Sequence, residues 1–529
     1  MLTFKSVTFT YPGSSTPVIS DLNLHVGRGE RIAVMGANGS GKSTLALLAA
    51  GIISPSSGEI VRSGDSQEPP GLVLQSPDSQ LVSISIEREL AFPLECRQWD
   101  FDAIHEAVDT TIAHSGFNGR RKNLPSNLSG GEKQKLALFS AMIAAPAILV
   151  LDEPTSHLDA EGKKLMWNAI DEVSKSNPDI SIIVVTQSSS EALKVSRLIV
   201  VDEGRVVSDD EPRPILFNPE SYAQSNLNAP PEYYVDALDV SVKENVFLGG
   251  SVPPHQVTHS PLVRLSDLTF EWEDGTKVFD DLSLTINERR VVGLAAKSGG
   301  GKTTLAHLMA GLLDPSSGTI NIRDHECAVD DLLETVSYLF QFPERQVFLP
   351  TVREEVCYGL KQQGVNHREL NDGLHWALEM VGLDVASFES RSPFRLSGGE
   401  LRKVALASII ALRRELTIYD EPTAELDSAS REAFRRVLMS VKGDGRTQLV
   451  VSHDTNFLFD ACDDILLMSN GGLVFDGDKF ETIERPELYE KCGVAVPDIV
   501  SLCRRYRSAA DIVVKNRIAS LAELHARVK

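Results

Sequence analysis

The chain consists of one long segment repeated twice. Four short motifs of the first half recur in the second half in the same order, offset by about 260 residues. The matched pairs are 39–44 with 299–304, 55–58 with 315–318, 128–132 with 396–400, and 152–155 with 420–423. A repeat of this length is a duplicated domain, because solenoid units are far shorter. The 529 residues are therefore expected to fold as two similar domains rather than around one core.

Each half carries a glycine-rich loop of the GxxxxGK[ST] type, between an apolar, strand-like run and a helix-like run. In such a loop the backbone N–H groups and the helix N-terminus surround phosphate, and the lysine contacts the β/γ oxygens. The hydroxyl after the lysine, on Ser43 or Thr303, reaches Mg²⁺. The predicted nucleotide-binding residues are Gly36, Asn38, Gly39, Gly41, Lys42, Ser43 and Thr44 in the first loop and Ser298, Gly299, Gly301, Lys302, Thr303 and Thr304 in the second.

The second loop departs from the pattern at its first position, where Ala296 replaces the glycine found at Gly36. If the backbone needs a positive φ there, alanine costs on the order of 1 kcal/mol. Because the lysine and the hydroxyl remain, we still expect nucleotide binding.

Each half also contains an apolar run that ends in two acids. In parallel α/β sheets, ligands bind at the carboxyl ends of the strands, so these acids are expected in the site. Asp152 and Asp420 are predicted to hold the Mg²⁺ shell. Glu153 and Glu421 are predicted to orient or deprotonate the attacking water.

A Leu-Ser-Gly-Gly-Glu motif precedes the acid pair in both halves, at 128–132 and 396–400. Serine and two glycines before a helical run make a helix N-terminus that can hold an anion. The motif resembles the signature of the ATP-binding-cassette (ABC) family, and the resemblance covers nearly the whole chain except a linker and a tail. It implies an α/β fold with two P-loop NTPase domains, each with a mainly parallel sheet core, an antiparallel β subdomain and a helical subdomain.

In the ABC family, the signature motif clamps the ATP that is bound by the opposite domain. The resemblance therefore implies an internal pseudo-dimer of the two halves with two composite sites for ATP and Mg²⁺. It also implies that two glutamines, Gln75 and Gln341, contact Mg²⁺ and sense a transport partner. The signature residues expected to contact nucleotide are Ser129, Gly131, Ser397 and Gly399.

Two aromatic residues, Tyr11 and Trp272, precede the phosphate loops at matching positions. Each is a candidate to stack on adenine, and a buried strand aromatic is the alternative.

The halves differ at the switch position, where His453 matches the family's γ-phosphate histidine and Gln187 replaces it in the first half. Glutamine can donate a hydrogen bond but cannot shuttle a proton. We therefore expect the site that contains His453 to hydrolyse ATP faster.

A Q-x-P-[DE]-x-Q segment begins at each glutamine, at 75–80 and 341–346. Together with the helix starts that follow, it resembles the ATPases of energy-coupling-factor importers, which take up vitamins and transition-metal ions. The resemblance implies that a membrane-embedded transport subunit contacts the segments from Gln75 to Phe92 and from Gln341 to Tyr358. A separate membrane protein would bind the substrate. The alternative is a solvated loop and helix start.

Three other functions stay open: a fused ATPase of a sugar-type ABC importer, a soluble tandem ABC ATPase acting on the ribosome, and an inactive scaffold. The formal net charge of −22 argues against nucleic-acid binding, so no nucleic-acid partner is expected. Apolar runs are far shorter than the roughly 20 residues that cross a bilayer. The chain is thus expected to be a peripheral protein at the cytoplasmic face of the cell membrane.

Domain boundaries follow from the repeat and from a proline-rich stretch at about 211–260 that lacks periodicity. The expected domains are 1–240, with a linker from about 211, and 261–495. The tail at 496–529 is expected to form short helices, at 511–517 and 521–528, and to serve either as an accessory cap or as an oligomer contact.

Overall fold

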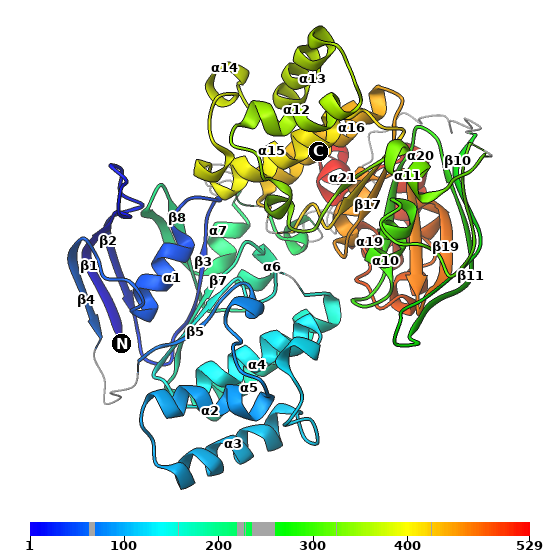
Figure 1. Ribbon diagram of the computed structural model, residues 1–529. Coiled ribbons are helices and arrows are strands. Elements are labelled where there is room, and N and C mark those ends of the chain that lie inside the picture. Colours follow the sequence, from blue (N-terminus) through cyan, green and yellow to red (C-terminus); the bar gives the residue numbers. More distant parts are fainter. Residues whose placement is uncertain are drawn as a thin grey trace. The chain divides into compact units, whose positions relative to one another are not determined.

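The computed structural model describes residues 1–62, 69–156, 158–218, 227, 229–234, 260–323, 325–424 and 426–528. The backbone divides into two compact units, Met1–Tyr234 and Val235–Lys529. Each unit contains a six-stranded, mainly parallel sheet, a smaller antiparallel sheet and a group of helices (Figure 1). The predicted α/β class with two P-loop domains is confirmed.

The first unit is built on a large sheet in the order β5-β6-β7-β3-β8-β9, in which β8 and β9 pair antiparallel and the other pairs are parallel. A small antiparallel sheet has the order β2-β1-β4. The strands are β1 (Leu2–Phe9), β2 (Ile19–Val26), β3 (Arg31–Met35), β4 (Ser57–Arg62), β5 (Gly71–Val73), β6 (Ile148–Asp152), β7 (Ser181–Val185), β8 (Arg197–Asp202) and β9 (Arg205–Asp210). The helices are α1 (Lys42–Ala50), α2 (Ile86–Cys96), α3 (Phe101–Ser115), α4 (Gly130–Met142), α5 (Ala160–Ser176), α6 (Ser189–Ala192) and α7 (Pro212–Leu216), with 3₁₀ turns η1 (Pro77–Ser79) and η2 (Pro125–Asn127).

Strand β3 is covered on both faces of the large sheet. Ile32 and Val34 face a core shared with α1 and the small sheet. Met35 points to the other face, into a core shared with α4 and α5. A strand covered on both faces has no polar side, so a short apolar run fixes its position in the centre of the sheet. The phosphate loop therefore leaves the sheet from a rigid, central strand.

The second unit repeats this plan, with the large sheet in the order β15-β16-β17-β12-β18-β19 and an antiparallel sheet in the order β11-β10-β13-β14. The strands are β10 (Pro261–Glu271), β11 (Lys277–Asn287), β12 (Val291–Ala295), β13 (Ser317–Ile322), β14 (His325–Glu326), β15 (Val336–Leu339), β16 (Leu416–Asp420), β17 (Thr447–Val451), β18 (Asp464–Ser469) and β19 (Gly472–Asp478). The helices are α10 (Lys302–Met309), α11 (Val329–Thr335), α12 (Val352–Gln362), α13 (His367–Met380), α14 (Val385–Phe388), α15 (Gly398–Ala411), α16 (Ser428–Gly443), α17 (Thr455–Ala461), α18 (Glu487–Lys491), α19 (Asp498–Arg505), α20 (Arg507–Asn516) and α21 (Leu521–Val528), with 3₁₀ turns η3 (Pro343–Gln346), η4 (Pro393–Arg395) and η5 (Lys479–Thr482).

The segment expected to be a linker begins with ordered structure. Residues directly after Glu211 form α7, whose Ile215 and Leu216 are buried in the core of the first unit. Helix α7 therefore belongs to that unit, and the proline pattern hid it because Pro212 occupies the first helical position, where proline is tolerated. Residues 219–226, 228 and 235–259 of the expected linker lie outside the described residues.

The C-terminal tail forms α19, α20 and α21 and packs on the second unit. Val500 and Val513 are fully buried. Asp498 exchanges two hydrogen bonds with Asn456 of α17, at 2.7 and 2.8 Å. The tail is therefore part of the second unit. In the described part of the chain, no helix combines the length and apolar character needed to cross a membrane.

Candidate nucleotide-binding and hydrolysis sites

The phosphate loop of the first unit connects β3 to α1. Gly39 and Gly41 have φ angles of 80° and 101°, which glycine adopts without strain, and α1 begins directly at Lys42. The Lys42 side chain is buried, and its Nζ donates to the carbonyls of Gly36 at 2.9 Å and Ala37 at 2.8 Å. The charge is therefore held over the loop, where phosphate oxygens can replace these carbonyls.

The second phosphate loop has the same geometry in spite of Ala296. Lys302 Nζ donates to the Ala296 carbonyl at 2.8 Å, and Gly301 has a φ of 89° before α10. Ala296 is not among the described non-glycine residues with positive φ, so the expected strain is absent. A methyl on Gly36 would lie 2.7 Å from Ser40 Oγ, whereas the position that matches Ser40 is Gly300. Ala296 thus avoids the contact with a serine hydroxyl that a methyl on Gly36 would make.

Exchanging these two loop residues tests this explanation. In Gly36→Ala, the new Cβ would lie 2.1 Å from the Val201 carbonyl oxygen, so the backbone must shift. We expect nucleotide binding by the first unit to weaken by about tenfold or more, since overpacking of a tight site costs roughly 1–3 kcal/mol. Ala296→Gly should change binding by the second unit less than about threefold, because it only removes a methyl group that the loop tolerates. Binding of a fluorescent ATP analogue measures both, and an equal loss in the two variants would contradict the explanation.

In each unit, the hydroxyl and the aspartate predicted to hold Mg²⁺ lie together. Ser43 Oγ donates to Asp152 Oδ1 at 3.4 Å, and Thr303 Oγ1 donates to Asp420 Oδ2 at 3.1 Å. Burial raises the pKa of both Asp152 and Asp420 above the usual carboxyl value. In the described part of the chain, Asp420 Oδ1 is buried without a hydrogen-bond partner. A buried carboxylate oxygen that lacks a donor fits a divalent cation, and this cation would supply charge stabilisation for phosphoryl transfer.

In the first unit, two predicted glutamines donate hydrogen bonds to Glu153. Gln187 Nε2 donates to Glu153 Oε1 at 2.9 Å and to Asn38 Oδ1 at 2.8 Å, and Gln75 Nε2 donates to Glu153 Oε2 at 3.3 Å. Glu153 has a φ of 45°, a strained conformation that is typical of functional sites. The carboxylate is therefore fixed at the end of β6 by two neutral amides.

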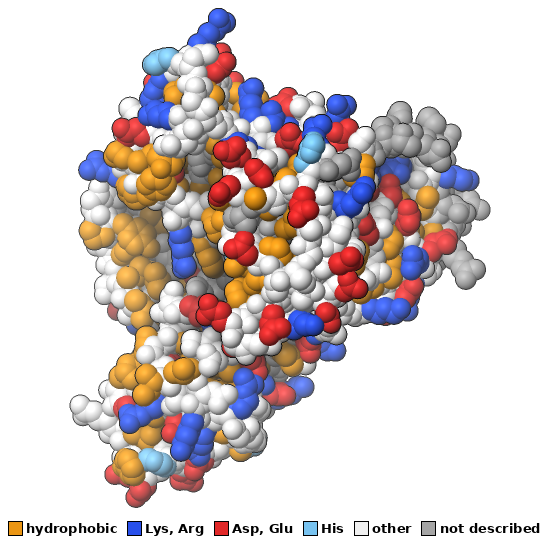
Figure 2. Space-filling view, turned by 45° about the vertical axis from the view of Figure 1, so that its right-hand side comes forward, with side chains coloured by type: hydrophobic (Ala, Val, Ile, Leu, Met, Phe, Trp, Pro, Cys, Tyr) orange, Lys and Arg blue, Asp and Glu red, His pale blue; other side chains and the backbone are white. Residues whose placement is uncertain are grey.

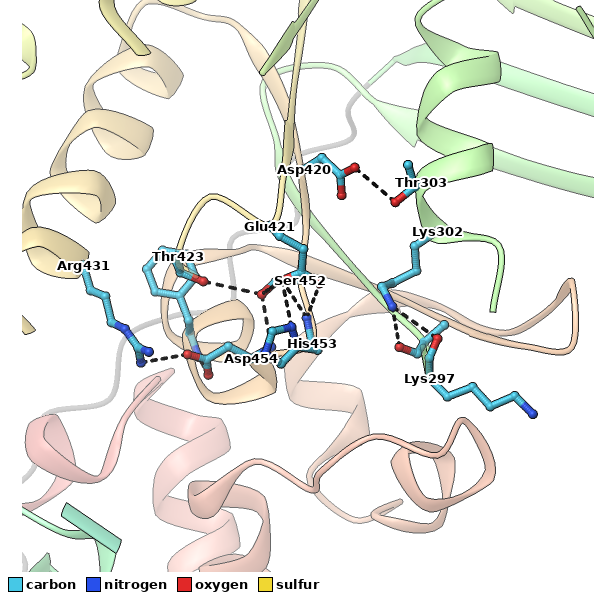
Figure 3. A network of polar contacts seen from close by, with 12 residues as sticks. Lys297, Lys302, Thr303, Asp420, Glu421, Thr423, Arg431, Ser452, His453 and Asp454 are labelled. Carbon is cyan, nitrogen blue, oxygen red and sulfur yellow. Dashed lines mark hydrogen bonds and ion pairs between the residues drawn. The ribbon is translucent and has the colours of Figure 1, made fainter. Parts of the chain in front are cut away.

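In the second unit, Glu421 has a different set of partners (Figure 3). His453 Nδ1 lies 2.9 Å from Glu421 Oε2, the His453 N–H donates to Oε1 at 3.1 Å, and Ser452 Oγ donates to Oε2 at 3.1 Å. Burial pushes the pKa of Glu421 upward, but the charge and hydrogen bonds of His453 and the charge of Lys302 outweigh it, so the net pKa lies below the usual value. Glu421 is thus kept ionised, as a residue that orients or activates water must be.

Other predicted residues are less tightly joined to the sites. Gln341 is exposed, and in the described part of the chain no hydrogen bond joins it to Glu421. The Tyr11 hydroxyl is 3.1 Å from Thr44 Oγ1, which places that ring beside the first phosphate loop. Trp272 packs edge-on against Phe270 and remains 42% exposed. Neither ring is buried in a core, so both keep a free surface for a base.

The signature serines cap their own helices. Ser129 is the N-cap of α4, and its Oγ donates to Glu132 Oε2 at 3.1 Å; Ser397 Oγ and Glu400 Oε2 repeat this contact before α15 at 2.7 Å. Gly398 and Gly399 have open space where a side chain would stand. The start of α15 is therefore sterically open, and binding of ATP by either signature motif stays a prediction.

Sequence reasoning missed several hydroxyl and carboxyl groups around the acids. Thr186, which precedes Gln187, donates to the buried Glu191 at 2.7 Å, and Thr155 also bonds to Glu191. The matching residue in the second unit, Ser452, bonds instead to Glu421. Tyr338 bonds to Asp420. These residues lie close in sequence to known motifs, and this was the signal that could have identified them. Spacing alone does not show which group a hydroxyl contacts.

In both units, a strand end places an aspartate beside the hydroxyl of a phosphate loop, with a glutamate following it directly. This arrangement defines a P-loop nucleoside triphosphatase, present twice in one chain. A family model described as "ABC transporter" matches residues 19–156 and 279–424, which is more than half of the chain. The chain belongs to the ABC transporter family, and it is a tandem ATPase of that family.

Known proteins match the tandem organisation. A relative from Caldanaerobacter subterraneus subsp. tengcongensis, described as an ABC transporter ATP-binding protein, is 29% identical and covers 95% of both chains. Among solved structures, an archaeal ribosome recycling factor, aABCE1, in complex with the ribosomal stalk protein aP1, is 20% identical over 91% of each chain, with a TM-score of 0.59. The cbiO1 protein of Clostridium perfringens, part of the transporter complex cbiONQ, is 23% identical over 48% of this chain and 98% of that one, with a TM-score of 0.41.

Proposed function

We propose that this ATPase powers a membrane transporter, and specifically an importer of the energy-coupling-factor type that takes up vitamins or transition-metal ions. The observation that carries the proposal is an exposed apolar patch beside each Q-x-P-[DE]-x-Q segment. Hydrolysis would take place with MgATP bound by each phosphate loop and closed over by the signature helix of the other half. The membrane subunit would be moved by the opening and closing of these two composite sites.

The segment after Gln75 is rigidly built in the first unit. Gln80 accepts a hydrogen bond from the Leu74 N–H at 3.0 Å and donates to the Leu72 carbonyl at 2.9 Å, so its side chain closes the loop at the end of β5. Glu89 of α2 accepts from two further backbone N–H groups, those of Val82 and Ser83. The second glutamine of the motif is therefore a structural clamp.

The same clamp in the second unit is formed by Gln346 and Glu355, which bond to the Phe340, Phe348 and Leu349 N–H groups. Both loops are thus held by one half-buried glutamine and one buried glutamate, while large apolar side chains nearby are exposed. In the first unit the exposed set is Val82, Ile84 and Phe92, and in the second it is Phe348 and Tyr358.

An ordered loop that exposes large apolar side chains is the expected surface for an apolar partner segment. The rings of Phe348 and Tyr358 contact each other edge-to-face, with centroids 5.2 Å apart, and present a preformed aromatic site. A helix laid into such a site buries one apolar face at little conformational cost. A coupling helix of a membrane-embedded subunit has this chemistry, and the substrate would be bound by a separate membrane protein.

The alternative of action on the ribosome is less well supported. The match to aABCE1 is below 25% identity and shows the shared fold alone. Contact with ribosomal RNA requires clustered Lys and Arg, and the chain has a net charge of −22. On the face seen in Figure 2, basic and acidic side chains are interspersed. A sugar-type importer ATPase shares the ABC fold, so the identity of the membrane partner distinguishes this alternative from the proposed function.

The partner surface can be tested with the double variant Phe348→Ser/Tyr358→Ser. Because buried aromatic anchors are worth about 2 kcal/mol or more at an interface, association with the membrane fraction of the native cells should fall by roughly 30-fold or more. Leu333→Ser, which alters a half-exposed apolar residue on α11, is the control and should associate normally. ATP binding should be unchanged in both variants. Sedimentation of the native chain with ribosomes rather than membranes would overturn the proposal.

A further inference from the structure

The metal carboxylate of the second unit has a hydrogen-bond donor that the motifs do not contain. The Tyr338 hydroxyl donates to Asp420 Oδ2 at 2.9 Å, and both side chains are buried. We propose that Tyr338 is a positioning residue for Mg²⁺ in the second unit: it holds Asp420 so that its other oxygen is available to the cation. The proposal rests on the predicted role of Asp420 as a residue of the Mg²⁺ shell.

The hydrogen bonds of Asp420 separate its two oxygens. Oδ2 accepts from both Tyr338 and Thr303, at 2.9 and 3.1 Å. Oδ1 is buried and has no hydrogen-bond partner among the described residues. The two donors on Oδ2 fix the rotation of the carboxylate, because turning the carboxylate would break both hydrogen bonds. Oδ1 is then a desolvated acceptor, and leaving it unpaired costs free energy unless a cation or a water molecule binds it.

The Tyr338 ring is itself held in place. It lies on β15, which pairs in parallel with β16, and its backbone partner is Ile418, two residues before Asp420. His307 of α10 and Phe340 pack against the ring, with centroids 5.2 and 4.7 Å away. Packing against two rings limits the phenol to a narrow range of positions, which is what a supporting residue of a metal site requires.

The first unit lacks this device. In the first unit, Val150 of β6 lies two residues before Asp152, and it pairs with Leu72 of β5. Leu72 therefore occupies the position of Tyr338, and a leucine side chain cannot donate a hydrogen bond. Asp152 keeps the contact with Ser43 at the longer distance of 3.4 Å. The two units therefore differ in the hydrogen bonds that hold the predicted metal carboxylate, as well as in the residues around the glutamates. Asp420 is held by a tyrosine and a threonine hydroxyl, whereas Asp152 is held by a serine hydroxyl.

The test uses the full chain in a Lys42→Ala background, which restricts nucleotide binding to the second unit. The Mg²⁺ concentration that gives half-maximal binding of a fluorescent ATP analogue is measured for Tyr338→Phe, and Mn²⁺ binding in the presence of nucleotide is followed by electron paramagnetic resonance. Loss of a supporting hydrogen bond should raise the required metal concentration by roughly tenfold. Binding of the analogue without metal should not change.

Two further variants separate the possible outcomes. Tyr419→Phe removes another buried phenol from the adjacent strand, where the hydroxyl bonds to Gln448 Oε1 at 3.1 Å, and it should leave the metal requirement unchanged. Asp420→Asn should raise the requirement more than Tyr338→Phe; if it has no effect, the predicted metal role of Asp420 fails, and this proposal fails with it. If Asp420→Asn raises the requirement but Tyr338→Phe does not, or if Tyr419→Phe has the same effect, the positioning role alone is overturned.

Discussion

Replacing Glu421 by glutamine is expected to reduce ATP turnover of the whole chain by about 100-fold or more, the range in which a positioned acid–base group contributes. Glu153→Gln, the same change in the first unit, is expected to reduce turnover by less than about tenfold. The reason is that the two acids have different surroundings although their motifs are identical.

Glu421 has the surroundings of an active group. Its carboxylate contacts the His453 imidazole at 2.9 Å, and its net pKa lies below the usual value. His453 can exchange a proton and change its charge, which the amides around Glu153 cannot do. Glutamine at position 421 preserves size and hydrogen bonding but removes the negative charge, so the variant isolates the chemical contribution.

Phosphate release by the two purified single variants, with ATP binding measured in parallel, tests this difference. Both variants should still bind ATP, because glutamine keeps the size of the side chain and Lys42 and Lys302 remain on the carbonyls of their loops. A larger loss of turnover in Glu153→Gln than in Glu421→Gln would show that the switch residue does not determine which site is faster.

Much of the fold and of the candidate site could be predicted because it depends on local patterns. After Arg31, the run at 32–35 is apolar throughout, and it forms most of the central strand β3. Lys42, Asp152 and Glu153 come together because their motifs follow β3 and β6, two parallel strands of one sheet that are separated by β7. Such features follow from periodicity and from sheet geometry, which a single sequence reveals.

The remaining features depend on contacts between distant residues. The strain expected at Ala296 is absent because its φ is not positive, and Gly300 stands where the first loop has Ser40. Gln80 and Gln346 were considered only as parts of a partner motif, yet each closes its own loop through backbone hydrogen bonds. The contact of Tyr338 with Asp420 joins residues 82 positions apart. No spacing rule predicts these side-chain directions.

The second large effect is expected when both phosphate-loop lysines are removed. Lys42 and Lys302 each place Nζ over the loop carbonyls, where the nucleotide phosphates are predicted to bind. Alanine at both positions removes the charged hydrogen bonds to phosphate, each worth roughly 1.5–3 kcal/mol. MgATP affinity should therefore fall by about 100-fold or more, and turnover should be lost. Lys297→Ala is the matched control, since its side chain points away from the loop interior (Figure 3).

The most direct test of a tandem ATPase with two phosphate loops is calorimetric titration of MgATP into the native chain and into Lys42→Ala/Lys302→Ala. The native chain should bind nucleotide at both loops, and the double variant should show no measurable binding and no phosphate release. Unchanged affinity and turnover in the double variant would contradict the account.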